Sequence, residues 1–457
     1  MEHNTPSLNA TTTPDSEAIT VIETQEPSVR ALRGLDAVNF FLADVRDGLG
    51  PYLAIYLISV RGPAHGWNEA TAGTVMTIAG IVGLIATTPI GWLIDLTNFK
   101  RAVIAVGAVL ITVSCIVLPW ASYNFYLVAV TQSIAAIAAT AFAPALAAIS
   151  LGIVGPARFS RRVGRNEGFN HAGNALAAGL TAGLAHVYGP VVVFWLIGAL
   201  AVVSIACTLV IPGREIDNRV GRGLVDIEHR RRRLRPSGFK VLLTDRRLFL
   251  LALVCALFHL ANAAMLPTVG ELLTREAGPS MATTLMAVCI VAAQLVMVPT
   301  ALLTGKFTDR VGRKPLFLVA FGVLTLRGCL YNAWHNRYYL LAVQLLDGIG
   351  AGIYGALFPV VVGDLTRGTG HFNIAQGAVA TAQGLGASLS ATLAGHIIVH
   401  VSVETNVAGV ETNNSMVVSR VSMPSAPVAA CSSYGMDGAE TVVPAGAVWI
   451  SSLSPKP

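Results

Sequence analysis

The stretch that decides the fold reads GKFTDRVGRK, from Gly305 to Lys314. It combines a glycine, an Asp-Arg pair and a basic cluster, and it lies between two long apolar segments. A weaker copy, GWLIDLTNFKR, occupies Gly91 to Arg101, again where one apolar segment ends and the next begins. The chain therefore contains an internal repeat, and each copy is predicted to be a short charged turn between two membrane-spanning helices.

The composition also indicates a membrane protein. Of the 457 residues 54% are hydrophobic and only 12% are charged, with a mean hydropathy of +0.63, whereas soluble domains carry roughly 25% charged residues. A helix needs about 20 apolar residues to cross the hydrocarbon core. Eleven such helices are predicted, over residues 37–60, 70–94, 102–121, 125–154, 168–188, 191–211, 248–272, 281–303, 316–334, 338–362 and 374–400.

Lysine and arginine concentrate in the even-numbered loops between these helices. The positive-inside rule then places these loops and the N-terminus in the cytoplasm. The polar segment 1–35 is predicted to be a disordered cytoplasmic tail. The longest basic loop, 214–247, contains HRRRRLR and is interpreted as a cytoplasmic linker, with binding of anionic lipid headgroups as the alternative. The net charge of +6 follows from this bias, so nucleic acid is not an expected partner.

The linker divides the predicted helices into six before it, in 36–213, and five after it, in 248–400. A duplicated six-helix unit requires a twelfth helix, but 401–457 has no apolar run of sufficient length. One interpretation is an eleven-helix protein with an external tail. The other, which we favour, is that the twelfth helix is missing or replaced. The predicted fold class is therefore an all-α integral membrane protein with two pseudo-repeated bundles.

Two further pairs support the duplication: Gln132 with Gln344, and Pro144 with Pro359, at equivalent places in their halves. On these residues and the repeated motif, the chain resembles the major facilitator superfamily of secondary transporters. That family's signature, G-x-x-x-D-[RK]-x-G-[RK]-[RK], is matched in the second half by Gly305, Asp309, Arg310, Gly312, Arg313 and Lys314. The first half keeps Gly91, Asp95 and Lys100 but departs from the signature at Leu96, Asn98 and Phe99.

The resemblance implies alternating access, in which two bundles rock around a central site. In the motif, glycine permits close helix contact, the aspartate can accept hydrogen bonds from a neighbouring helix N-terminus, and basic residues anchor to headgroups. Asp95 and Asp309 are therefore expected to act in gating rather than in substrate binding. The departures in the first copy weaken the expectation of a charge relay there.

The first predicted span carries Asp44, Arg46 and Asp47. A charge inside a membrane helix costs a few kcal/mol, so each is a candidate for proton coupling or transport. The alternative is that Arg46 simply neutralises an aspartate or a neighbouring helix. Arg327 and Asp347, in the ninth and tenth spans, are predicted to lie at similar depth and to meet. We interpret them as a structural ion pair, with Asp347 as a proton carrier in the alternative.

Neutral polar residues in the spans are candidates to line a substrate cavity, although such residues often bind helix to helix instead. His171 could titrate near neutral pH, but a lone histidine near a helix end is more often a packing group. Gln294 and His259 are further polar residues of unknown direction. The cavity candidates are Gln132, Asn170, His171, Asn174, Asn262, Gln344, Gln376 and Gln383.

The predicted function is secondary active transport of a small organic molecule, coupled to protons. The sequence has no nucleotide-binding P-loop and no cysteine or histidine pattern typical of a metal site, so no cofactor is expected. Efflux of a drug or metabolite by proton antiport is the alternative, disfavoured because GNALAAGLTAG lacks the glycine-proline string of drug antiporters. A channel or a membrane enzyme is a remote alternative. We expect a monomer in contact with membrane lipids, in the cytoplasmic membrane if the source is bacterial.

Overall fold

The computed structural model describes residues 26–47, 53–54, 56–62, 65–189, 191–224, 245–277, 279–334 and 336–407. Within these ranges the regular secondary structure is helical, without a strand. The first half contains α1 (Val29–Asp47), η1 (Tyr56–Arg61), α3 (Glu69–Leu96), α4 (Lys100–Ala121), α5 (Phe125–Ala139), α6 (Phe142–Val154), α7 (Pro156–Tyr188) and α8 (Val192–Val210). The second half contains α10 (Arg246–Asn262), α11 (Met265–Ala277), α12 (Pro279–Val311), α13 (Arg313–Tyr331), α14 (Arg337–Leu365) and α15 (Phe372–Val407).

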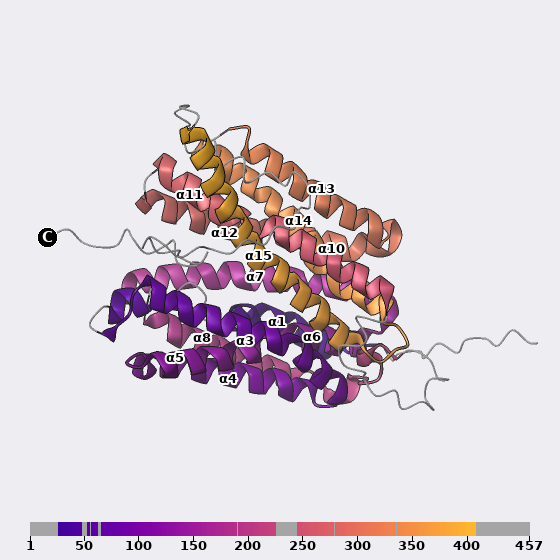
Figure 1. The fold of residues 1–457 in the computed structure, drawn as a ribbon. Helices are drawn as coiled ribbons and strands as arrows, with labels where there is room; N and C mark the ends of the chain where they lie inside the picture. Colours follow the sequence, from indigo (N-terminus) through magenta and orange to yellow (C-terminus); the bar gives the residue numbers. More distant parts are fainter. Residues whose placement is uncertain are drawn as a thin grey trace, which may run out of the picture.

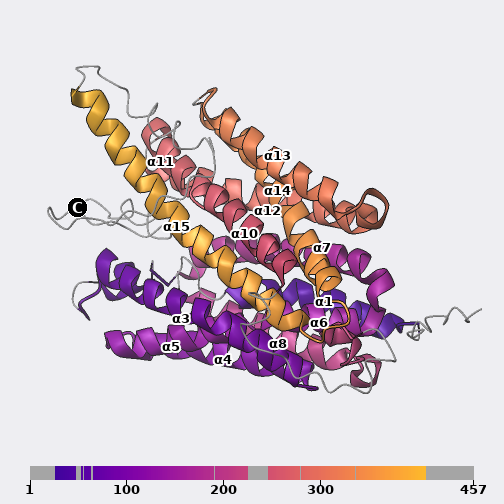
Figure 2. The ribbon, with the colours of Figure 1, turned by 45° about the vertical axis from the view of Figure 1, so that its right-hand side comes forward.

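The helices form two layers, one from each half of the chain. In Figure 1 helices α1 to α8 make up the lower layer and α10 to α15 the upper layer. The layers meet mainly along two helix pairs, α7 with α12 and α3 with α15, and α14 also contacts α7. Figures 1 and 2 both show α15 starting beside the end of α3 and ending beside α11, on the far side of the upper layer. The predicted fold class, two bundles of membrane helices, is confirmed.

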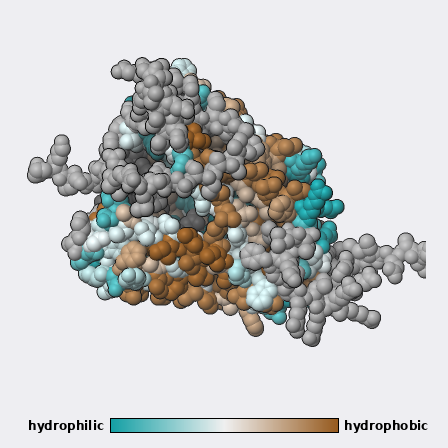
Figure 3. Space-filling model, in the orientation of Figure 1, coloured by the Kyte–Doolittle hydropathy of each residue, from teal (hydrophilic) through white to brown (hydrophobic). Residues whose placement is uncertain are grey.

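Apolar length explains why these helices suit a membrane. Eight helical segments of the described part are long and apolar enough to span a bilayer. Large apolar side chains on their outer faces are exposed, such as Ile85 on α3, Trp120 on α4 and Trp195 on α8. The space-filling view shows a broad hydrophobic surface across the middle of the molecule, with hydrophilic residues toward its ends (Figure 3). An apolar belt of this kind is what a hydrocarbon core requires.

Two predicted spans are each built from two helices, and proline accounts for both breaks. A proline cannot donate a hydrogen bond to the carbonyl four residues earlier. Because residue 144 is a proline, the carbonyl of Thr140, between α5 and α6, receives no such bond. Pro267 has the same effect on the carbonyl of Ala263, between α10 and α11. The first break matters for function because it places Thr140 beside the interface between the two halves.

The largest difference from the sequence-based prediction concerns the fifth helix. It was expected to begin near Gly168, but α7 begins at Pro156, directly after Gly155. Gly155 has a positive φ of 70° and Pro156 occupies the first helical position, an arrangement that ends one helix and starts the next without a loop. The polar residues that follow are helical because they pack against α1, α6 and α12, which hydropathy does not detect.

Other helix ends also extend beyond their apolar cores. Helix α1 begins at Val29 rather than Ala37, and α15 continues through Val407. Residues 1–25, most of the basic linker at 225–244, and 408–457 lie outside the described residues. The prediction of a missing or replaced twelfth helix falls on this last range.

Candidate functional site

The first copy of the repeated motif joins the two halves through Asp95. This carboxylate, fully buried at the end of α3, accepts hydrogen bonds from the backbone N–H groups of Asn373 (3.2 Å) and Ile374 (2.8 Å) and from the Asn373 amide (2.7 Å). It therefore satisfies free N–H groups at the start of α15, where the helix dipole favours negative charge. Gly91, one turn earlier, lies against the Asn373 carbonyl so closely that any Cβ would collide with it.

The second copy makes a corresponding contact from the other half. Asp309 on α12 accepts a hydrogen bond from the hydroxyl of Ser160 on α7 at 2.5 Å, and Arg313 pairs with Asp309 at 3.1 Å. A Cβ on Gly305 would lie 2.7 Å from the Cα of Gly164, so only glycine permits this approach of α12 to α7. Both motif aspartates thus bridge the halves. We call this end of the molecule the motif end.

The basic residues of the motif divide into exposed and buried groups. Arg310 and Lys314 are exposed, as headgroup anchors should be. Lys100 is only 1% exposed, and its Nζ donates to the Thr97 carbonyl and to the Asn218 side chain, each at 3.0 Å. The expectation of a headgroup anchor is therefore wrong for Lys100, which instead fastens the start of α4 to the segment after α8. Gly312, with a φ of 91°, forms the turn from α12 into α13.

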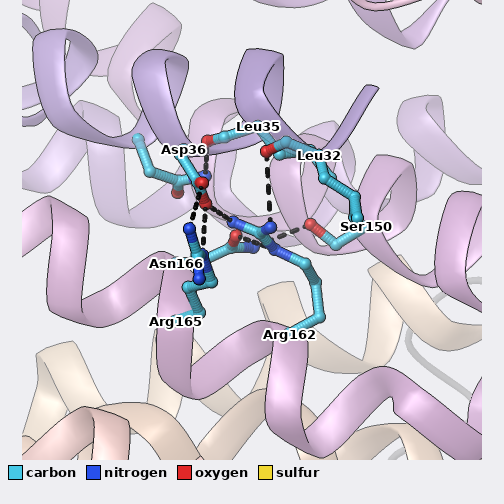
Figure 4. A network of polar contacts seen from close by, with 8 residues as sticks. Leu32, Leu35, Asp36, Ser150, Arg162, Arg165 and Asn166 are labelled. Carbon is cyan, nitrogen blue, oxygen red and sulfur yellow. Dashed lines mark hydrogen bonds and ion pairs between the residues drawn. The ribbon is translucent and has the colours of Figure 1, made fainter. Parts of the chain in front are cut away.

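An ion network near the motif end, buried except for Arg165, holds the first half together (Figure 4). Asp36 on α1 pairs with Arg162 (2.5 Å) and Arg165 (2.7 Å) on α7. Arg162 also donates to Asn166, which in turn donates to Ser150 on α6. Asp36 precedes the apolar stretch of α1. Burial alone would raise its pKa, but the hydrogen bond from Arg165 and the charge of Arg162 hold the pKa below its usual value.

A cavity of about 320 Å³ lies between the halves. The break between α5 and α6 forms one wall, and the start of α15 forms another. The Nε2 atom of Gln376 is buried and has no hydrogen-bond partner among the described residues. Such an atom favours a ligand that can accept a hydrogen bond. The lining residues are Arg46, Thr87, Ala139, Thr140, Ala143, Pro144, Phe358, Gln376, Gly377 and Ala380.

The cavity lies directly inside the contacts of the motif end. A Cβ at Gly377 would lie 2.5 Å from the Thr87 carbonyl, so α3 and α15 touch at the edge of the cavity. One turn further along, Thr88 and Thr381 share a hydrogen bond of 3.0 Å across the same pair of helices. Helices α3 and α15 each form part of the cavity wall, and they contact each other at its edge. The hydrogen bonds accepted by Asp95 hold the start of α15 in this position.

A second polar cluster crosses the interface between α7 and α12. The Nδ1 atom of His171 lies 2.7 Å from the amide oxygen of Gln294 on α12. Its Nε2 atom lies 3.9 Å from the carboxylate of Glu167, one turn earlier on α7, and Asn170 donates to the same carboxylate. Sequence reasoning missed Glu167 because it assigned this residue to a loop. A start of the helix at Pro156 puts Glu167 well inside it.

Arg327 and Asp347 form an ion pair, as the sequence predicted that they could. Arg327 is 2% exposed and also donates to Asn262 on α10. Gln344 donates to Asp347 at 3.2 Å and accepts from the Tyr331 hydroxyl. All these residues belong to α10, α13 and α14, so the network ties helices within the second half and does not cross to the first.

The remaining candidates are dispersed. Gln383 donates to the hydroxyl of Tyr354 inside the second half, and Gln132 is buried in α5 without a hydrogen-bond partner for its Nε2 among the described residues. Asn174 and Asp44 are half-buried in α7 and α1. The side chain of Asp47 lies outside the described part of the structure.

Comparison with known proteins agrees with this architecture. The sequence model described as Major Facilitator Superfamily matches residues 37–326 and 255–407. Two proteins of Mycobacterium tuberculosis, from strains CDC 1551 / Oshkosh and ATCC 25618 / H37Rv, are each named as an uncharacterized MFS-type transporter. Both are 53% identical to this chain over 373 residues, which is 81% of this chain and 87% of each of theirs.

The chain belongs to the Major Facilitator Superfamily. Its fold is similar to that of the proton:xylose symporter XylE bound to 6-bromo-6-deoxy-D-glucose, with a TM-score of 0.57 and 11% sequence identity, covering 86% of this chain and 94% of that one. At this identity the likeness concerns the fold alone. The family match, the two relatives and the apolar helices together identify the chain as an integral, multi-pass membrane transporter.

For a Major Facilitator Superfamily transporter, the position of each polar cluster relative to the two halves is informative. The contacts of Asp95, Asp309 and Gln294 cross between the halves, so they must change when the halves move. Those of Asp36 and Arg327 stay within one half and can be preserved during such a movement.

Proposed function

We propose that this protein moves a small organic molecule across the membrane by alternating access, driven by a proton gradient. The observation that carries the proposal is the cavity between the halves, which adjoins contacts that close one end. A volume of about 320 Å³ suits a small metabolite. Arg46 and Gln376 line it from opposite halves, so one bound molecule would touch both.

Opening of the motif end requires the separation of α3 from α15 and of α7 from α12. Asp95 would then lose its contacts with α15, and Asp309 would lose Ser160. Hydrogen bonds to charged groups are worth about 1.5–3 kcal/mol each. Contacts of this strength can hold one state closed and still be exchanged for others when a ligand binds.

The distribution of basic residues supports a cytoplasmic position for the motif end, with the N-terminus on the same side. In that orientation the described state is closed toward the cytoplasm. The sequence contains no P-loop, and membrane-embedded acidic groups make protons the available coupling ion. The sequence-based candidates for carrying the proton are Asp44 and Asp47 on α1 and Asp347 on α14. The protein of similar fold is itself named a proton:xylose symporter.

The test is transport by the purified chain in proteoliposomes. A panel of labelled sugars, organic acids, amines and amino acids would be offered with an imposed pH gradient of either sign, and both uptake and efflux recorded. We expect accumulation of at least one class that collapses when a protonophore removes the gradient. Accumulation in the opposite direction to the proton would indicate efflux by antiport, the alternative function.

Gln376→Ala is the matched variant for the cavity. We expect it to raise the concentration needed for half-maximal transport, because a donor to the substrate is lost. Thr325→Ala, on the exposed face of α13, removes a polar group remote from the cavity and serves as the control. If no compound is transported in either direction, or if Gln376→Ala and Thr325→Ala behave alike, the proposed site is wrong.

A further inference from the structure

The polar cluster between α7 and α12 has an arrangement of hydrogen-bonding groups that requires explanation. Gln294 presents its amide oxygen to His171, so Nδ1 of the imidazole must carry the donated proton. In a neutral imidazole the other nitrogen, Nε2, is then an acceptor. Nε2 is buried and has no hydrogen-bond partner among the described residues. The Glu167 carboxylate, 3.9 Å from Nε2, is also an acceptor.

Two acceptors that face each other in a buried place are unfavourable, and one added proton removes the conflict. When Nε2 binds a proton, the imidazolium faces a carboxylate and gains a charged partner. We infer that His171 and Glu167 together form the proton-binding site through which this transporter couples to the proton gradient. The inference rests on the proposed transport function and names residues that perform it.

The position of the cluster fits a coupling role. His171 lies roughly 22 Å along α7 from Pro156, near the middle of a helix that is about 50 Å long. The side chains of His171 and Glu167 are 12% and 23% exposed and Nε2 itself is buried, so the site is enclosed in the described state. A proton passes from hydronium on one side of the membrane to Nε2, so an O–H bond breaks as the N–H bond forms. The reverse exchange returns it to water on the other side.

Protonation also acts on the interface that must move. His171 and Glu167 belong to the first half of the chain and Gln294 to the second. An imidazolium donates a stronger hydrogen bond to the Gln294 oxygen than a neutral ring does. Binding of the proton therefore stabilises the contact between α7 and α12, and its release favours separation of the two helices.

The helices packed against α7 carry other charged groups, several of which are paired elsewhere. On α1, Asp36 is paired with Arg162 and Arg165, and Asp44 and Arg46 follow further along the helix. On α12 the charges begin at Lys306, roughly 18 Å along the helix from Gln294. On α14, Gly355 faces Glu167, Asp347 is paired with Arg327, and Asp364 is paired with Arg313. Helix α6 carries no titratable side chain, and α8 carries only Cys207.

One other buried ion pair is less suited to coupling. Arg327 and Asp347 lie on α13 and α14, inside one half. Their contacts do not cross to the partner half, so occupancy by a proton has no direct effect on the moving interface. The His171 cluster differs because one of its hydrogen bonds crosses that interface.

The first experiment is nitrogen NMR of histidine-labelled protein in nanodiscs, which distinguishes neutral from doubly protonated rings. The His171 signal is assigned by its loss in His171→Gln. Spectra are recorded as the pH is lowered from about 8 to about 5, the range in which histidine is commonly examined. We expect the doubly protonated ring to appear in this protein and its signal to be diminished in Glu167→Gln. His65→Gln and Glu69→Gln, near the start of α3, are the controls. A His171 ring that stays neutral over this range, or that ignores Glu167→Gln, contradicts the inference.

The second experiment measures the effect of the proton on the interface. Spin labels at Val187 on α7 and Met281 on α12, both exposed near the end opposite the motif, report the distance between these helices by pulsed electron resonance. We expect acid pH to increase the population with the spacing of the described state, and His171→Gln to remove this pH dependence. A distance distribution that is equally sensitive to pH in His171→Gln would overturn the coupling role.

These outcomes can be separated from failure of the transport proposal. If His171 titrates and controls the α7–α12 distance but no compound is transported, the proton site stands and the transport assignment fails. If transport is found but is insensitive to the pH gradient and to His171→Gln, the transport assignment stands and the coupling inference fails.

Discussion

The pair formed by Arg327 and Asp347 gives a quantitative test of how the second half is held together. Arg327 is 2% exposed and the Asp347 side chain 18% exposed, so removal of one charge leaves the other largely buried and unpaired. Such a loss costs about 3–5 kcal/mol in folded proteins. We take about 3 kcal/mol, the lower value, because Asp347 keeps some access to solvent and a hydrogen bond from Gln344.

For a bundle of this size, each kcal/mol corresponds to roughly 2–4 °C in melting temperature, which predicts a loss of about 6–12 °C. Arg327→Met and Asp347→Asn are the single variants, measured by thermal unfolding of detergent-solubilised protein. The double variant leaves no unpaired charge and should recover more than half of the loss. If the two losses simply add in the double variant, the residues do not stabilise each other and the reasoning is refuted.

An exposed pair provides the control for this experiment. Arg158 and Glu26 lie 3.0 Å apart, but their side chains are 53% and 87% exposed. Surface pairs contribute about 0–1 kcal/mol. Arg158→Gln should therefore change the melting temperature by no more than a few degrees. A change as large as that of Arg327→Met would mean that burial does not account for the difference.

Three further predictions follow from other contacts. Because the pKa of Asp36 is lowered on folding, its carboxylate stabilises the fold at neutral pH, and this contribution is lost as the pH falls through the acid range. Asp36→Asn should therefore lower the melting temperature at pH 7 and make the melting temperature depend less on pH in the acid range. Gly91→Ala places a methyl group against the Asn373 carbonyl, so a cysteine at Thr381 should react faster with a polar reagent, and unchanged reactivity would contradict the tight α3–α15 contact. A tag after Pro457 should be labelled from the side opposite the motif end, because α15 runs away from that end; labelling from the motif side would require another span.

Apolar length and the repeated motif were sufficient to predict the helices and the two-bundle fold. Prediction succeeded here because a membrane requires long apolar helices with satisfied backbone groups, and few other structures meet that requirement. It failed at the start of α7, where polar residues are helical through packing rather than hydropathy. Gly155 followed by Pro156 was the available signal, since this order commonly ends one helix and begins the next.

That error had consequences for the candidate site. Glu167 was assigned to a loop, so its relation to His171 was missed, although a spacing of four residues places both on one face of a helix. Asp36 was missed because it lies just before the first apolar stretch, and its partners at 162 and 165 are far away in sequence. The partners of Gln294, Gln344 and Asn262 could not be predicted either. Which side chains meet across helices depends on helix rotation, and hydropathy carries little information about that.

The most direct test of the central claim, that the two halves alternate about the cavity, is a distance measurement at the motif end. Spin labels at Phe99, between α3 and α4, and Arg367, between α14 and α15, occupy exposed positions on opposite halves. In nanodiscs we expect a major short distance that matches the described state and a minor longer one. Asp95→Ala removes charge-assisted hydrogen bonds to α15 and should raise the ratio of long to short distances about tenfold or more. A single short distance that Asp95→Ala leaves unchanged would contradict the account.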